Sequence, residues 1–329
     1  NGLRRIRGNR ARPGIQALLQ IAKRQPHRLV ASDLGFAVGP RLNAAGRLDD
    51  MSLGIRCLMA ESAQEAQLLA SELDSLNLER REIEQGMQQE ALKSLESIAL
   101  SEESLPWGIC LHQDTWHQGV VGIVASRIKD KFHRPTIAFA EADENELKGS
   151  ARSIPGVHMR DTLDLVAKRY PQLLTKFGGH AMAAGLSLAK ENYQAFSEAF
   201  SEILAEQNDK SLLSASLMTD GALAGADINL ANAQMLRQGG PWGQHFPEPI
   251  FEGEFQIVQQ RIVGAAHLKL VLADVENPQD VIDAIAFNVD LAVWPNEGIK
   301  RAHLAYKLDV NEFRGRVSPQ LMVEELQPL

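Results

Sequence analysis

Residues 39–48 read Gly39-Pro40-Arg41-Leu42-Asn43-Ala44-Ala45-Gly46-Arg47-Leu48, with two arginines and an asparagine set among small residues. Small residues let the backbone approach a ligand closely, and the planar guanidinium group of arginine matches phosphate oxygens. The stretch therefore predicts a phosphate-facing loop that runs into a helix, with Arg41, Asn43 and Arg47 as candidate phosphate contacts. The alternative is a tight turn in which an arginine pairs with an acidic residue such as Asp49 or Asp50.

Three later segments carry related chemistry. Ser150 and Arg152 alternate on a predicted strand, so both side chains project from one face, where a hydroxyl and a guanidinium suit a terminal phosphate. His117 precedes a predicted helix start, where free backbone N–H groups favour an anion. The remaining segment is a glycine pair followed by a histidine, and it brings backbone amides close to an imidazole: Gly178, Gly179 and His180.

These four segments, in their order along the chain (39–48, 117–127, 149–153 and 176–185), resemble those of RecJ, a family of single-strand-specific DNA exonucleases in the DHH phosphoesterase superfamily. The resemblance covers nearly the whole chain. It implies that residues 39–48 face nucleic-acid phosphates beside a nuclease cleft and that the Ser150–Arg152 segment holds a 5′ end. It also implies that the turn at 178–180 borders the bound nucleotide, with His180 as a candidate catalytic residue.

The chain departs from this superfamily in one respect, because it contains no Asp-His-His motif and no Asp-x-Asp motif. In the superfamily that motif, with several further aspartates, holds two divalent metal ions. The resemblance implies Mn²⁺ or Mg²⁺ as cofactor of the full-length enzyme. We therefore expect the metal ligands to lie upstream, the chain to be the C-terminal portion of such a nuclease, and the chain alone to be inactive.

Composition sets broad limits on function. The 329 residues suffice for two or three domains, and 44% of them are hydrophobic, as in soluble globular proteins. The net charge of −8 argues against non-specific coating of nucleic acid but leaves room for a local basic channel. Cys57 and Cys110 match no zinc spacing and are interpreted as reduced core residues, which favours a cytoplasmic protein. No apolar run approaches the roughly 18 residues of a membrane span.

The first part of the chain is predicted to be helical. Pro13 suits the first turn of a helix to about Gln25, and a shorter helix is expected from Gly54 to Met59. Ser62 and Glu65 have the spacing of a capping box, and the helical pattern that follows continues without proline to about residue 98. Such a long helix predicts a strut between two domains, with a coiled-coil dimer helix as the alternative.

The rest of the chain predicts two further regions. The first alternates strands and helices in the order βαββαβα, which indicates a compact α/β domain. Its expected strands are 108–112, 136–140, 147–153 and 184–188, and its expected helices 120–132, 159–170 and 193–205. The second region has short strands at 251–257, 267–272, 284–289 and 303–310, with a helix at 230–237, which suggests a small barrel.

The resemblance implies an OB-fold for this last region. Single-strand binders of that type combine a positive groove with stacking aromatic side chains. Lys269 and Tyr306 are the candidates here, with Arg261, Lys307 and Arg314 near the predicted strand edges. The predicted domains are thus a remnant of the metal-binding domain (1–61), a connecting helix (62–98), a DHH-associated α/β domain (99–208) and an OB-fold-like nucleic-acid-binding domain (209–329).

Together these features predict the C-terminal part of a metal-dependent 5′→3′ exonuclease of single-stranded DNA that acts in recombination and repair. The expected partners are single-stranded DNA, single-strand-binding protein and a repair helicase, with no membrane association. Two alternatives remain open: a DHH-type phosphodiesterase of short oligonucleotides or cyclic dinucleotides, and a catalytically silent replication scaffold. The β-rich region argues against the first, and Arg41, Arg152 and the turn at 178–180 argue against the second.

Overall fold

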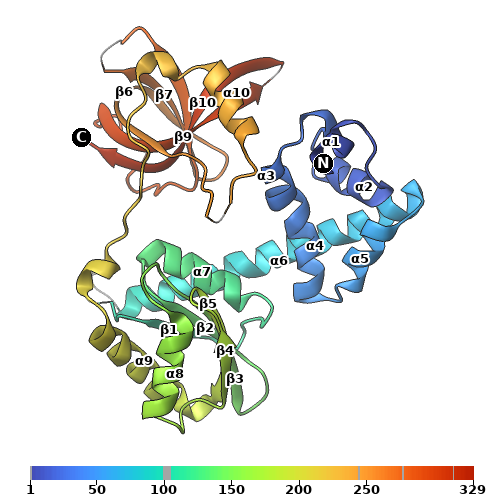
Figure 1. The fold of residues 1–329 in the computed structure, drawn as a ribbon. Helices are drawn as coiled ribbons and strands as arrows, with labels where there is room; N and C mark the ends of the chain where they lie inside the picture. Colours follow the sequence, from blue (N-terminus) through green and yellow to red (C-terminus); the bar gives the residue numbers. More distant parts are fainter. Residues whose placement is uncertain (1, 99–104, 244, 276–277, 314) are drawn as a thin grey trace. The chain divides into compact units, whose positions relative to one another are not determined.

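The computed structural model describes residues 2–98, 105–243, 245–275, 278–313 and 315–329. The chain forms two compact units (Figure 1). The larger unit comprises Gly8–His27 and Phe36–Ser216. The barrel unit comprises Leu217–Leu329 together with the residues up to Arg7 and Arg28–Gly35. Each unit is described below by itself.

The larger unit begins with short helices packed against one long helix. They are α2 (Pro13–Ile21), α4 (Gly39–Leu48) and α5 (Ser52–Met59), and all three contact α6 (Ala63–Ile98). Residues 39–48 therefore form a helix, and the prediction of a loop there was wrong. Pro40 is tolerated in a first helical turn, where its missing N–H needs no partner. Ala44 and Ala45 are fully buried, so packing on this side favours the helix.

The long helix α6 confirms the prediction of an extended helix over this part of the chain. Ser62 caps its start, since its Oγ accepts a hydrogen bond from the Glu65 backbone N–H at 3.1 Å. Near its start Ala66, Leu69, Ala70 and Leu73 are buried. Met87, Ala91 and Leu95 join the cluster formed with α7 and the sheet. One helix thus supports both the helical region and the sheet within the larger unit.

The sheet of the larger unit has five strands in the order β1-β2-β3-β5-β4. The parallel pair is β1 (Ile109–His112) and β2 (Thr136–Glu141), and the other neighbours are antiparallel. The remaining strands are β3 (Glu146–Arg152), β4 (Lys176–Gly179) and β5 (Ala183–Ala189). The edge strand β4 is an addition to the prediction, which treated residues 178–180 as a turn. Its two glycines and short length hid the strand pattern.

Helices cover both faces of this sheet. On one face, α7 (Val121–Phe132) and the later part of α6 share a core with Ala138 and Ala140 of β2. On the other face, α8 (Met159–Arg169) and α9 (Tyr193–Gln207) share a core with Phe139, Leu147 and Leu186. The predicted α/β domain is therefore confirmed (Figure 1).

The barrel unit contains a closed barrel in the order β10-β8-β7-β6-β9. Its strands are β6 (Phe251–Val263), β7 (His267–Asp274), β8 (Val281–Ala286), β9 (Arg301–Phe313) and β10 (Arg316–Pro328). The helix α10 (Leu230–Gly239) packs on β9. The predicted barrel is confirmed, although β10 was not foreseen and β8 begins earlier than expected. Among the described residues, no helix combines the length and the apolar character needed to cross a membrane.

Candidate nucleic-acid interface

Three of the four segments identified in the sequence meet at the start of α7. They are residues 39–48, the loop that contains His117, and the segment from Ser150 to Arg152. Arg47, near the end of α4, donates from Nη1 to the backbone oxygen of Gly119 at 3.1 Å. A Cβ atom added to Gly122, in the first turn of α7, would lie 2.7 Å from Arg152 Nη2 and 2.8 Å from Ser150 Oγ. The side chains of Ser150 and Arg152 therefore pack directly on the backbone of this helical turn. Residues more than 100 positions apart form one cluster.

The Arg152 guanidinium is half-buried and has only neutral hydrogen-bond partners among the described residues. Its Nη1 donates to Ser150 Oγ at 2.9 Å and to the Ala151 carbonyl at 2.8 Å. Burial, and then the positive charge of Arg47, lower the pKa of Arg152. Burial and the neighbouring positive charge both disfavour the charged form of Arg152, and an anion bound beside it would offset both effects.

The start of the helix adds to this imbalance. The first turn of α7 contributes the positive end of the helix dipole. Arg47 and Arg152 thus lie where a positive potential already exists, and among the described residues neither forms an ion pair with a carboxylate. Such an arrangement is suited to binding an anion with several oxygens, such as a phosphate.

His117 lies beside this cluster in the loop before α7. Its Nδ1 accepts a hydrogen bond from the Gly119 backbone N–H at 3.0 Å, and the residue is exposed. In the neutral ring Nε2 then carries the proton, so His117 offers an N–H donor to solvent or a ligand. The neighbouring Trp116 is buried and donates to Glu90 Oε2 at 2.8 Å, so its ring packs in the core and is not free to stack on a base.

Arg41 and Asn43 do not join this cluster in the same way. The Arg41 side chain is only 13% exposed, and its Nε lies 2.8 Å from Asp74 Oδ1 on α6. Its Nη1 also donates to the Ala37 carbonyl at 2.6 Å. Arg41 therefore fastens α4 to α6, with Asp74 as its partner instead of Asp49 or Asp50. Asn43 is exposed on α4.

The segment at 178–180 lies two strands away from Arg152 on the same sheet. Register places Ser150 opposite Gly185, and Gly185 opposite Gly178, so a strip of backbone without large side chains crosses three strands. The His180 backbone N–H donates to the Ala183 carbonyl at 2.8 Å, and its side chain is exposed. Since Ala183 pairs with Arg152, His180 and Arg152 are separated by two strand spacings, or about 10 Å.

Gly179 has a specific backbone requirement within this strip. Its φ of +146° is a conformation that L side chains rarely adopt, and an added Cβ would lie 2.5 Å from the Ala183 carbonyl oxygen. Only glycine fits this position without moving the edge of the sheet. The exposed His180 follows directly, so Gly179 fixes where the imidazole leaves the strand.

In the barrel unit, Tyr306 is misassigned as a stacking residue. It is 0% exposed and lies in the barrel core, with its ring centroid 5.7 Å from that of Phe255. Burial raises its pKa to about 12. The alternation in the sequence already contained this signal, because Leu304, Tyr306 and Leu308 share one face of β9 and all are buried.

The predicted basic groove of the barrel is also largely neutralised. Lys269 Nζ lies 2.8 Å from Asp283 Oδ2, and Lys307 Nζ lies 2.6 Å from Glu324 Oε1. Arg314 is outside the described residues. From Leu217 onwards the sequence contains 8 Lys and Arg against 15 Asp and Glu, a net charge of −7. Arg261 is exposed on β6.

Exposed aromatic side chains that the sequence did not single out occur on this unit. Phe287 is 51% exposed and follows β8, with its ring centroid 5.0 Å from that of His267. Phe246 and Phe313 are exposed as well. These rings, unlike Tyr306, are exposed to solvent, and exposed aromatic rings are what single-strand binders use to contact bases.

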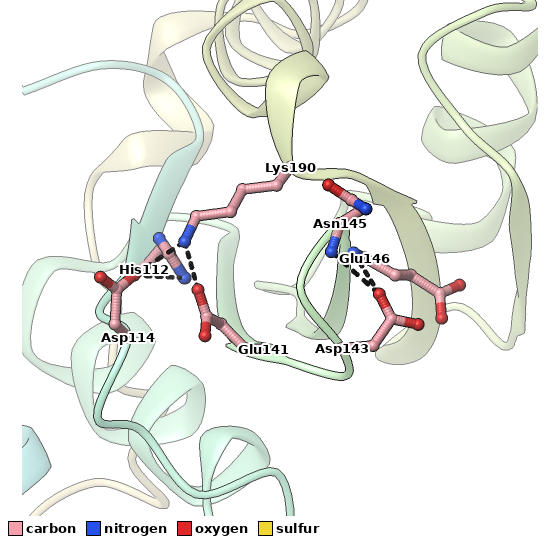
Figure 2. Close-up of polar contacts among 7 residues, drawn as sticks. All are labelled: His112, Asp114, Glu141, Asp143, Asn145, Glu146 and Lys190. Atoms are coloured by element: carbon pink, nitrogen blue, oxygen red, sulfur yellow. Dashed lines mark hydrogen bonds and ion pairs between the residues drawn. The ribbon is translucent and has the colours of Figure 1, made fainter.

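Potential metal ligands gather at one place in the described residues. His112, Asp114 and Glu141 form the only group of three or more such side chains found there (Figure 2). Three ligand residues do not supply what two bridged divalent ions need, since each such ion takes several oxygen ligands. The described part of the chain therefore does not fit a two-metal centre.

Comparison with known proteins gives matches to two family models. Residues 105–206 match the DHHA1 domain, and residues 219–325 match the RecJ OB domain. The first range contains β1 to β5 with α7, α8 and all but the last residue of α9, and the second contains the whole barrel apart from its last residues. The α/β sheet and the barrel are thus each assigned to a described domain family.

Whole-sequence relatives agree with these matches. The chain is 54% identical over 328 residues to the single-stranded-DNA-specific exonuclease RecJ of Salmonella typhimurium, and 53% identical to that of Escherichia coli. Each alignment covers 100% of this chain and 57% of the relative, at its C-terminal end. The chain therefore spans a little more than half the length of these curated relatives.

A solved structure shows the same fold. The crystal structure of RecJ from Thermus thermophilus in complex with Mn²⁺ superposes with a TM-score of 0.76 at 25% identity. The match covers 100% of this chain and 46% of that one. Its counterpart in complex with Mg²⁺ gives a TM-score of 0.75.

Proposed function

The chain belongs to the RecJ family, and from this membership we propose that it forms one wall of the DNA cleft of a 5′→3′ single-strand-specific exonuclease. The relatives are named as exonucleases specific for single-stranded DNA. Because the chain spans 57% of their length, the activity itself belongs to a full-length protein. Recombination and repair of DNA in the cytoplasm are the proposed cellular roles.

The observation that supports a role in end binding is the uncompensated positive cluster at the start of α7. Arg47, which donates to the Gly119 carbonyl, and the hydrogen-bonded pair Ser150 and Arg152 all contact the residues at the start of α7. A terminal phosphate there would accept charge-assisted hydrogen bonds and relieve the repulsion between the two arginines. We assign this cluster to the 5′ phosphate of the DNA strand.

The glycine strip extends this site across the sheet. Gly178 and Gly185 leave the backbone of β4 and β5 open, so a DNA strand can approach closely. His180 stands at the far end of the strip, about 10 Å from Arg152 by strand spacing. We propose that His180 contacts the DNA near the next phosphodiester, and that His117 donates from Nε2 to the same strand.

The metal chemistry of such an enzyme belongs outside this chain. The solved RecJ structures were obtained with Mg²⁺ or Mn²⁺, and the described residues do not fit a two-metal centre. We therefore propose that the ligands for these ions lie in a further part of the full-length protein. The chain alone then has no nuclease activity.

The barrel unit is proposed to contact single-stranded DNA as a secondary site. The match to the RecJ OB domain supports this role, and Phe287 offers an exposed ring. The net charge of −7 and the ion pairs of Lys269 and Lys307 limit its electrostatic contribution. We also propose that the chain divides into residues 1–61, 62–98, 99–208 and 209–329. The proposed protein partners are single-strand-binding protein and a helicase.

Two alternatives are less well supported. A phosphodiesterase for cyclic dinucleotides or short oligonucleotides would not need the barrel, which forms a third of the chain. A silent scaffold would not need two arginines held together without a carboxylate, since that arrangement costs stability unless an anion binds.

The test compares 5′-phosphorylated and 5′-hydroxyl oligonucleotides as substrates of the full-length enzyme. Arg152→Gln should lower kcat/KM for the phosphorylated substrate by roughly 10- to 100-fold, since a hydrogen bond to a charged group contributes about 1.5–3 kcal/mol. The hydroxyl substrate should change little. Arg160→Gln is the matched control, because Arg160 is exposed on α8, on the opposite face of the sheet. An unchanged ratio between the substrates in Arg152→Gln would remove the end-binding assignment.

A further inference from the structure

A small polar cluster lies where β1 and β2 end, and the proposed function does not use it. His112 is the last residue of β1, Asp114 follows in the next loop, and Glu141 is the last residue of β2. Because β1 and β2 are parallel, their carboxyl ends meet at one edge of the sheet, where ligand sites of α/β proteins gather. One potential ligand atom from each residue lies within 4.8 Å of the others.

Lys190 points into this cluster from the short helix η4 (Lys190–Asn192) that follows β5 (Figure 2). Its Nζ lies 3.3 Å from Asp114 Oδ1 and contacts Glu141 Oε1. The two carboxylates thus hold a single positive charge between them. With the imidazole neutral, the cluster keeps a net charge of −1, and it has the electrostatic capacity for a cation of higher charge.

His112 provides an observation that does not depend on the acidic residues. Its side chain is 13% exposed, and its Nε2 is buried without a hydrogen-bond partner. This atom faces the cluster, 3.6 Å from Asp114 Oδ1. Leaving a buried polar atom unpaired is costly, so a ligand atom bound beside His112 Nε2 would relieve this cost.

The neighbouring acidic residue in Figure 2 does not belong to this set. Asp143 Oδ1 accepts hydrogen bonds from the backbone N–H groups of Asn145 and Glu146, both at 2.9 Å. It is therefore committed to the turn between β2 and β3. The ligand set consists of one imidazole nitrogen and two carboxylate oxygens.

We propose that His112, Asp114 and Glu141 bind one divalent first-row transition-metal ion, with Lys190 as the cation that this ion displaces. Mixed imidazole and carboxylate donors favour ions such as Zn²⁺, Co²⁺ or Mn²⁺ over Ca²⁺ and Mg²⁺, which prefer oxygen ligands alone. The ligand atoms must move closer together to reach bonds of about 2.0–2.2 Å. Asp114 is 71% exposed on its loop, so its carboxylate can make this movement once Lys190 is displaced.

The position of the cluster ties metal binding to the loop before α7. Gln118 Nε2 donates to the Glu141 carbonyl at 2.7 Å, and Asp114 belongs to the same loop. An ion held by Asp114 and Glu141 would fasten residue 114 of this loop to the end of β2 that Gln118 already contacts. The ion thus serves to fasten this loop to the sheet.

The proposal is tested with Co²⁺, whose visible absorption reports its coordination, titrated into the untagged 329-residue chain. Binding should saturate at one ion per chain. Lys190→Gln should tighten binding by about tenfold or more, because it removes a competing positive charge a few ångströms from the ion. The matched control is Lys168→Gln, which removes an exposed lysine ion-paired with Asp164 on α8 and should leave the affinity unchanged.

Asp114→Asn and Glu141→Gln should each weaken Co²⁺ binding by about tenfold or more and change the absorption spectrum, since metal affinity depends strongly on ligand charge. Asp114 is exposed, so the first variant keeps the fold, and circular dichroism verifies this. The proposal is wrong if Lys190→Gln and Lys168→Gln bind Co²⁺ equally. It is also wrong if Asp114→Asn binds as tightly as the unaltered chain, or if no saturable binding occurs in Lys190→Gln.

Discussion

Gly122→Ala should separate end recognition from stability in this protein. The added methyl group would lie 2.7 Å from Arg152 Nη2 and 2.8 Å from Ser150 Oγ, closer than such contacts allow. Both atoms are the ends of side chains, so the guanidinium and the hydroxyl move and the sheet and helix stay in place. The variant therefore displaces the proposed phosphate ligands while it keeps their chemical identity.

We expect Gly122→Ala to keep or raise the stability of the protein but to lower its kcat/KM for a 5′-phosphorylated substrate. Alanine is a better helix former than glycine by up to about 1 kcal/mol, so the stability of α7 should hold or rise. Loss of a well-aimed hydrogen bond to a charged group costs about 1.5–3 kcal/mol, which corresponds to roughly 10- to 100-fold in kcat/KM for a 5′-phosphorylated substrate. An ordinary destabilising substitution cannot produce this combination.

The assay measures degradation of 5′-phosphorylated and 5′-hydroxyl oligonucleotides by the full-length enzyme, together with its thermal unfolding. Gly86→Ala is the control, since Gly86 lies in α6 with nothing within 4 Å of an added Cβ. The control should gain stability and keep its preference for the phosphorylated end. If Gly122→Ala unfolds at the original temperature and still prefers that end equally, the reasoning about Arg152 and Ser150 is refuted.

Three further outcomes are expected. Arg41→Met should lower the free energy of unfolding in urea by about 1–3 kcal/mol, because it leaves Asp74 without its partly buried partner. If the two side chains are coupled, Asp74→Asn and the double variant should lose about as much as Arg41→Met. A double variant whose loss equals the sum of the two single losses would contradict this pairing. Tyr306→Phe should leave binding of single-stranded DNA unchanged and hold or raise stability, as the hydroxyl is buried without a partner; weaker DNA binding measured by anisotropy would mean that this hydroxyl takes part in binding and would contradict its place in the barrel core. Incubated with labelled single-stranded DNA and Mn²⁺, the purified chain should release no nucleotides, and metal-dependent release that survives purification would overturn this.

Much of the fold was predictable because its signals are local. The capping serine and the unbroken helical spacing indicated α6, and short apolar segments between the predicted helices indicated β1, β2, β3 and β5. The strand β4 was missed because glycines carry no side-chain pattern. The helical state of residues 39–48 was missed because it depends on burial of Ala44 and Ala45 against other helices.

The candidate site was predictable in its parts but not in its assembly. The period of two along a strand placed Ser150 and Arg152 on one face, and the structure shows them hydrogen-bonded. Arg41 and Arg47 are six residues apart, which is about 120° around a helix. A helix therefore points them in different directions, so one pairs with Asp74 and the other reaches Gly119. A loop would have allowed both to face one ligand.

The sequence by itself determined the local elements, the family resemblance and the residue types that suit phosphate. Only the tertiary structure decided which of these residues meet. It brought Arg47 to Arg152 across a separation of more than 100 residues, and it gave Lys190 to Asp114 and Glu141. The physical reason is that periodicity fixes which side chains share a face, whereas the packing of distant elements fixes which face is covered and what lies opposite it.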